Sequence, residues 1–304
     1  MTEPPLEWLA LARGTLDRAA ELRRDEAFLA SAWTDPRTRV LVVERGKALV
    51  SDGDAPALAL LPPAQAPAGE RWLMGQDASG AAYFTVPAPL PAVEGTRPAG
   101  LREVGALLDD LESGLLTQSV ALEHWHATHG HCPRCGAPTE VRAAGHVRRC
   151  PQDGAEQFPR LDPAVIMLVQ DDDGNVLLAR GPQWPADRRS ILAGFVEPGE
   201  SLEQAVAREV KEEVGIPVQD VHYLGSQPWP LPQSLMLGFF ARTPGSRPPL
   251  YPDDDEITDA AWYSRDELRA AVDAGDIVAP GPLSIAAQLI MRWFGGPLPK
   301  MPAF

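Results

Sequence analysis

The sequence is poor in cysteine, in basic side chains and in long hydrophobic runs, and each shortage excludes a class of protein. Three cysteines among 304 residues are too few to frame a disulfide-rich secreted domain. No apolar run approaches the roughly 20 residues that a membrane-spanning helix needs. The first residues, Met-Thr-Glu-Pro-Pro, lack the basic and apolar regions of a signal peptide. We therefore expect a soluble, cytoplasmic protein.

Basic side chains are outnumbered by acidic ones, 27 against 42, which gives a formal net charge of −15. Such a surface repels polyphosphates and anionic membranes unless metal ions or local arginine clusters intervene. A wide nucleic-acid-binding surface is therefore not expected. The hydrophobic content of 44% and the charged content of 23% are those of an ordinary globular protein, and the length predicts two domains with a small appendage.

The hydrophobic pattern divides the chain into two parts. In the first hundred residues, short runs at 39–43, 57–61, 72–74 and 83–86 predict strands, and the proline-rich stretch 87–98 predicts a linker or long loop. Apolar residues between positions 101 and 126 recur every three to four residues, as in an amphipathic helix or a helix pair. From residue 163 onward, a strand at 164–170, an acidic turn and a strand at 175–180 predict a hairpin that opens a mixed α/β domain.

The cysteines lie in two similar knuckles, residues 132–135 and 150–153, whose separation is that of a zinc ribbon. Tetrahedral zinc needs four donors, and an aspartate stands where the fourth cysteine would be. The predicted zinc ligands are Cys132, Cys135, Cys150 and Asp153. His131 and His146 are alternative fourth ligands, and a degenerate ribbon without metal is the other interpretation. A closed site of this kind would support folding and not catalysis.

A capped acidic helix is predicted at residues 201–214. Ser201 followed by Gln204 makes a capping box, and Gly215 is placed to end the helix.

Three glutamates, Glu209, Glu212 and Glu213, stand at i, i+3 and i+4 of this helix and project from one sector of it. Their mutual repulsion favours a bound cation, and Mg²⁺ or Mn²⁺ prefers carboxylate oxygen. A solvated acidic face balanced by Arg208 and Lys211 is the alternative.

Residues 194–216 resemble the Nudix box, G-x5-E-x7-R-E-U-x-E-E-x-G-U with U apolar, at every specified position. Residues 226–234, SQPWPLPQS, resemble the SQPWPFPxS signature of NADH pyrophosphatases, which are also regarded as NAD-capped RNA hydrolases, with Leu231 as the one departure. The upstream ribbon and N-terminal domain are also this family's arrangement. The resemblance implies an α/β (α+β) protein with a mixed N-terminal domain at 1–125, a zinc ribbon at 126–160 and a Nudix α/β/α sandwich at 161–304.

The resemblance also implies an activity: metal-dependent hydrolysis of the pyrophosphate of NAD(H) to nicotinamide mononucleotide and AMP, with removal of NAD caps from RNA 5′ ends. The resemblance assigns Glu209, Glu212 and Glu213 as the catalytic, metal-binding carboxylates. It does not specify which group activates the attacking water. It also assigns Glu256 as a further metal ligand. The alternative is that Glu256 is one of the acidic residues of a solvated turn. Arg208 is expected to orient Glu200.

The substrate residues carried over by the same resemblance are Phe195, Gln227, Trp229, Ser234 and Ala286. Phe195 and Trp229 are expected to hold the nicotinamide ring from different subunits of a homodimer. The alternatives are a Nudix hydrolase of another dinucleotide, such as ADP-ribose, and a non-catalytic regulator that binds nucleotides or RNA. The near-complete signature argues against the first, and the complete box argues against the second. The resemblance does not specify whether the substrate is NADH, NAD or capped RNA, nor which metal is used.

Overall fold

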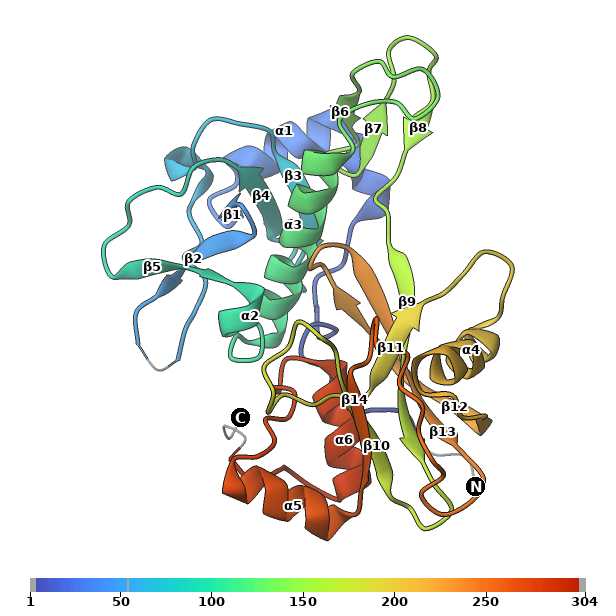
Figure 1. Ribbon diagram of the computed structural model, residues 1–304. Helices are drawn as coiled ribbons and strands as arrows, with labels where there is room; N and C mark the ends of the chain where they lie inside the picture. Colours follow the sequence, from blue (N-terminus) through green and yellow to red (C-terminus); the bar gives the residue numbers. More distant parts are fainter. Residues whose placement is uncertain (1–3, 54, 301–304) are drawn as a thin grey trace. The chain divides into compact units, whose positions relative to one another are not determined.

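The computed structural model describes residues 4–53 and 55–300, and the chain divides into two compact units (Figure 1). One unit is Arg13–Leu161 together with Trp229–Gln233. The other consists of residues 4–12, Asp162–Pro228 and the chain from Ser234 onward. None of the helices in the described residues is both long and apolar enough to cross a bilayer.

The Arg13–Leu161 unit is built on a five-stranded sheet of order β3-β4-β1-β2-β5. Its strands are β1 (Arg39–Glu44), β2 (Lys47–Ser51), β3 (Trp72–Gln76), β4 (Ala82–Pro87) and β5 (Thr96–Gly100). β1 runs parallel to β4, and the other neighbours are antiparallel. Its helices are η1 (Ala20–Arg24), α1 (Glu26–Thr34), η2 (Pro63–Gln65), α2 (Leu101–Val104) and α3 (Asp110–Thr128).

Two sequence expectations in this unit need correction. Residues 57–61 form no strand; Leu58 and Leu61 make only single bridges, to Val50 and Val40. Prolines at 56 and 62 bound this segment, and proline cannot donate to a ladder. The expected linker at 87–98 is also shorter, because its last residues belong to β5, an edge strand that can accommodate Pro98. The expected helix pair is confirmed as α2 and α3.

The ribbon is a small antiparallel sheet made of β6 (Glu140–Arg142), β7 (Val147–Arg149) and β8 (Glu156–Gln157). It follows α3 directly, and the cysteine knuckles lie in the loops that precede β6 and follow β7.

The second unit is a six-stranded sheet of order β12-β13-β9-β10-β14, with β11 paired to β9. Its strands are β9 (Asp162–Gln170), β10 (Val176–Arg180), β11 (Leu192–Phe195), β12 (Gln219–Trp229), β13 (Ser234–Arg242) and β14 (Asp259–Tyr263). Its helices are α4 (Leu202–Val214), α5 (Arg265–Ala274) and α6 (Ile285–Phe294). The predicted β9–β10 hairpin is present, and the carboxylate of Asp171 accepts hydrogen bonds from the backbone of Asp173 and Asn175 in its turn.

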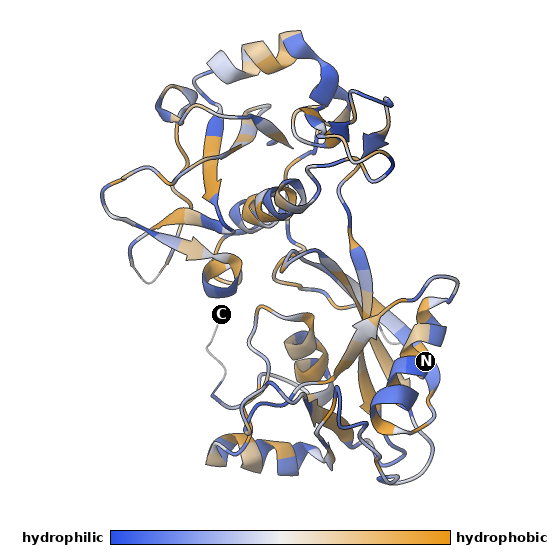
Figure 2. Ribbon diagram, turned by 45° about the horizontal axis from the view of Figure 1, so that its top comes forward, coloured by the Kyte–Doolittle hydropathy of each residue, from blue (hydrophilic) through white to orange (hydrophobic). Residues whose placement is uncertain are grey.

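Alternation along β9 explains why helices cover both faces of this sheet. Successive strand residues point to opposite faces. Val165, Met167 and Val169 pack in one cluster with α4, while Ile166 and Leu168 pack in another with α5 and α6. Figure 2 shows hydrophobic residues along the strands and α6, and hydrophilic residues on the outer side of α4. The expected α/β/α sandwich is thus confirmed.

Candidate active site and ribbon metal centre

The local sequence fixes both ends of α4. The side chain of Ser201 accepts a hydrogen bond from the Gln204 amide at 3.3 Å, and the Gln204 side chain accepts one from the Ser201 amide at 2.8 Å. Gly215 ends the helix in the left-handed region, with φ of 74°. The predicted capping box and helix end are confirmed.

Three carboxylates meet beside this helix. Glu209 and Glu213 from α4 and Glu256 from the loop before β14 each offer an oxygen, and these oxygens lie within 4.8 Å of one another. Glu209 and Glu213 are only 7% and 4% exposed. Burial, with the negative charges of Glu209 and Glu256 nearby, raises the pKa of Glu213 to about 8, and burial raises the pKa of Glu209. Such a cluster gains strongly from a cation.

Two details of the surroundings fit a divalent ion at these carboxylates. The Oε2 atom of Glu213 is buried and has no hydrogen-bond partner. At Gly194 on β11, a Cβ atom would lie 1.9 Å from the Cδ of Glu209, so only glycine leaves room for that carboxylate. The donors are all oxygen, which suits Mg²⁺ or Mn²⁺.

Glu212 lies outside this cluster. Its carboxylate pairs with Arg208 at 2.9 Å, and its side chain is 59% exposed. At about 100° per residue, Glu212 and Glu213 point a quarter turn apart, while Glu209 and Glu213 differ by only about 40°. The structure therefore brings together three of the four predicted metal-binding carboxylates and leaves Glu212 at the rim.

Arg208 ties the helix to the strand and loop before it. Its guanidinium donates to both carboxylate oxygens of Glu200, at 2.6 and 3.1 Å, and to the Phe195 carbonyl at 2.9 Å. It also pairs with Glu209 at 2.9 Å. This guanidinium lowers the pKa of Glu200. As expected, Arg208 orients Glu200, and it also sets the position of Glu209.

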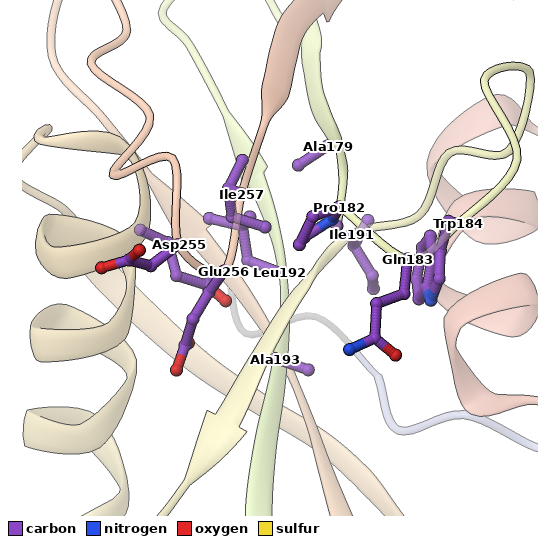
Figure 3. A pocket seen from close by; sticks show the side chains of 12 residues that line it. Ala179, Pro182, Gln183, Trp184, Ile191, Leu192, Ala193, Asp255, Glu256 and Ile257 are labelled. Atoms are coloured by element: carbon purple, nitrogen blue, oxygen red, sulfur yellow. The ribbon is translucent and has the colours of Figure 1, made fainter.

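A cavity of about 390 Å³ adjoins the carboxylate cluster. Glu213, Asp255 and Glu256 line it on the acidic side, and the rest of its lining is Ala179, the loop at 181–184, residues 191–193 and Ile257. Figure 3 shows Gln183 and Trp184 on one side and Asp255 and Glu256 on the other. Sequence reasoning did not single out Gln183 or Trp184; the only signal was a tryptophan bracketed by Pro182 and Pro185 in a loop.

The predicted substrate residues have different environments. Phe195 ends β11 and is 60% exposed. Trp229 belongs to the Arg13–Leu161 unit, where the Arg102 guanidinium lies 5.4 Å from its ring centroid. Ser234 begins β13 and is half-buried.

Gln227 and Ala286 are buried in the second unit. Gln227 is fully buried, and its side-chain amide donates to the Leu283 carbonyl at 3.0 Å. Ala286 is packed in the core cluster of α6. In this conformation Gln227 holds the segment that leads into α6.

The ribbon brings its four predicted ligands together. The ligand atoms of Cys132, Cys135, Cys150 and Asp153 all lie within 4.8 Å of one another. The two knuckles repeat one hydrogen bond, from the Gly136 amide to the Cys132 carbonyl at 2.8 Å and from the Gly154 amide to the Cys150 carbonyl at 3.0 Å.

The alternative histidine ligands are not members of this group. The His146 ring donates to the Leu73 carbonyl at 2.7 Å, and His131 is absent from the cluster. Three thiols and one carboxylate in this arrangement suit zinc.

Comparison with known proteins agrees with this fold and identifies a Nudix hydrolase. Residues 160–279 match the NUDIX domain family, residues 127–158 match the NADH pyrophosphatase zinc ribbon domain, and residues 37–125 match the NADH pyrophosphatase-like rudimentary NUDIX domain. The chain belongs to the NADH pyrophosphatase and NAD-capped RNA hydrolase family of Nudix proteins.

Three relatives illustrate the similarity, and each is named NAD-capped RNA hydrolase NudC. The protein of Mycobacterium bovis is 42% identical over 93% of this chain and 94% of its own length. That of Stutzerimonas stutzeri is 41% identical over 71% of this chain and 75% of its own. That of Deinococcus radiodurans is 37% identical over 77% and 82%. Among solved structures, a NUDIX hydrolase from Nitrosomonas europaea covers 55% of this chain and 94% of its own, with 20% identity and a TM-score of 0.42.

Proposed function

We propose that this protein hydrolyses the pyrophosphate of NAD(H) to nicotinamide mononucleotide and AMP with the help of a divalent cation, and removes NAD caps from RNA 5′ ends. The observation that carries the proposal is the trio Glu209, Glu213 and Glu256 beside a cavity. The names of the 37–42% identical relatives support the substrate class.

The residues of the site have separable tasks in this reaction. Glu209, Glu213 and Glu256 would hold Mg²⁺ or Mn²⁺, which supplies charge neutralisation at the pyrophosphate and a lowered pKa of bound water. The proton taken from the attacking water is assigned to these three carboxylates as a group. Arg208 keeps Glu209 aimed at the site through its bonds to Glu200 and the Phe195 carbonyl.

For the nicotinamide ring, we propose a sandwich between Phe195 and Trp229 contributed by two subunits of a homodimer. The exposed ring of Phe195 on β11 supports the first half of this arrangement. Trp229 stands in a segment stiffened by Pro228, Pro230 and Pro232, so little entropy is lost when its ring stacks.

The ribbon is proposed to bind one structural zinc ion through Cys132, Cys135, Cys150 and Asp153. Free cysteines suit a reducing compartment, and we propose the cytoplasm.

The test is a product assay with NADH, NAD, ADP-ribose and NAD-capped RNA under matched Mg²⁺ and Mn²⁺. The proposal requires nicotinamide mononucleotide and AMP from NADH or NAD, and release of nicotinamide mononucleotide from capped RNA. Faster cleavage of ADP-ribose than of either dinucleotide would instead support the alternative substrate.

A further inference from the structure

The loop between β10 and β11 lines part of the cavity and is held by hydrogen bonds within the loop and to Val278. The Trp184 amide donates to the Gly181 carbonyl, and the Arg188 amide donates to the Pro185 carbonyl, each at 3.1 Å. The Val278 amide donates to the Asp187 carbonyl at 2.8 Å. These bonds fix the path of the loop, so the side chains it presents to the cavity are positioned in advance.

Trp184 is the large aromatic side chain of this wall. It lines the cavity yet is 39% exposed. The guanidinium of Arg188 lies 5.0 Å from its ring centroid, and Pro182 and Pro185 bracket it in the chain. A tryptophan that only filled the core would be more deeply buried. The stiff backbone and the cation over the ring instead indicate that the indole is fixed in a position where a flat ligand can stack on it.

The cavity has the size and chemistry of a nucleotide subsite. Its volume of about 390 Å³ falls within the roughly 300–1,000 Å³ of small-molecule pockets. Ile191, Ala193 and Ile257 give it apolar walls, and Gln183 offers an amide donor and acceptor for the edge of a base. Two members of the carboxylate cluster, Glu213 and Glu256, line its acidic side, so a molecule with phosphate at the cation would extend into this space.

We propose that Trp184 stacks on the planar adenine base of the dinucleotide, with its pyrophosphate at Glu209, Glu213 and Glu256. This inference rests on the proposed function and adds a second ring-binding place to it. Ala193 and Phe195 stand two residues apart on β11 and point to the same face. The Trp184 cavity and the Phe195 ring are therefore successive positions along one strand, which suits a substrate with two rings.

The experiment measures binding of AMP and of nicotinamide mononucleotide separately, by calorimetry with Mg²⁺ present. Trp184→Ala should weaken binding of AMP about tenfold or more, which is what one base–aromatic stacking contact is worth, and should leave binding of nicotinamide mononucleotide unchanged, because the nicotinamide ring is placed at Phe195 and Trp229. Trp184→Phe should retain most of the affinity. Phe158→Ala, an exposed aromatic of the ribbon segment, is the matched control and should bind both probes normally.

Unchanged binding of AMP by Trp184→Ala, or equal loss of both probes, would overturn the proposal. In turnover of NADH, the alanine variant should raise KM much more than it lowers kcat, because the carboxylate cluster is intact. The binding assay needs no turnover. If the wild type failed to cleave NADH, the proposed function would fall, while a selective loss of AMP binding in Trp184→Ala would still establish the stacking site.

Discussion

Gly194→Ala should disable the proposed cation site while leaving the fold standing. The added Cβ would lie 1.9 Å from Cδ and 2.1 and 2.2 Å from the two carboxylate oxygens of Glu209. Carbon atoms in contact need about 3.5–4.0 Å, so the carboxylate must withdraw by about 2 Å. Metal–oxygen bonds in a site of this kind tolerate only about 0.2 Å. Glu209 would therefore leave the cluster.

The strand itself should tolerate the substitution. Gly194 is not among the glycines with positive φ, so alanine can adopt its backbone conformation, and the clashing atoms are the end of a side chain that can rotate. We expect a change in the free energy of unfolding within about 1 kcal/mol, against a loss of at least 10-fold in Mg²⁺ affinity and a larger loss in turnover.

The assay compares Mg²⁺ binding by calorimetry, kcat for NADH and the thermal midpoint among three proteins. Gly281→Ala is the matched control, since nothing lies within 4 Å of its Cβ position and its φ is not positive. Wild-type Mg²⁺ affinity and turnover in Gly194→Ala would refute the reasoning, because Glu209 would then be dispensable. A large fall in the thermal midpoint would show instead that the strand, and not the Glu209 side chain, moves to relieve the clash.

Four further outcomes follow from the same structure. Glu213→Gln should lower turnover by orders of magnitude, whereas Glu212→Gln should cost much less, because only the first is in the cluster; equal losses would contradict this. Elemental analysis should find one zinc per chain, and Asp153→Ala should weaken its retention against chelator. Trp229→Ala should impair cleavage of NADH more than that of ADP-ribose, which lacks the nicotinamide; equal losses at a lowered thermal midpoint would indicate core packing. Burial lowers the pKa of His146 to about 4, so the folded state favours the neutral ring. The free energy of unfolding should therefore fall by up to about 3 kcal/mol as pH drops from about 6.5 to 4. In urea titrations, His146→Gln should flatten this pH dependence.

Local chemistry made part of the site predictable. The cap at Ser201, the helix end at Gly215 and the two cysteine knuckles depend on residues a few positions apart, and the structure has them as expected. The membership of Asp153 in the ribbon cluster follows from the same short spacing.

Other features depend on packing that spacing does not encode. Three glutamates on one helical sector looked equivalent, but the rotation of α4 on the sheet buries Glu209 and Glu213 and leaves Glu212 at the surface. For Trp184 the sequence offers only its flanking prolines, because the cavity that it lines forms only when its loop meets Glu256, far along the chain. The residues at 57–61 carry a strand-like apolar pattern, yet they do not form a continuous ladder between their prolines.

Helix α4 couples stability to the proposed chemistry through neighbouring residues. Val210 and Val214 are fully buried against the sheet, and each directly follows one of the buried acids, Glu209 and Glu213. The apolar packing therefore holds two carboxylates where burial and mutual repulsion oppose their ionised forms. A bound cation removes that opposition. This packing therefore lowers the stability of the cation-free protein at neutral pH, and it also holds the two carboxylates in position to bind a divalent metal.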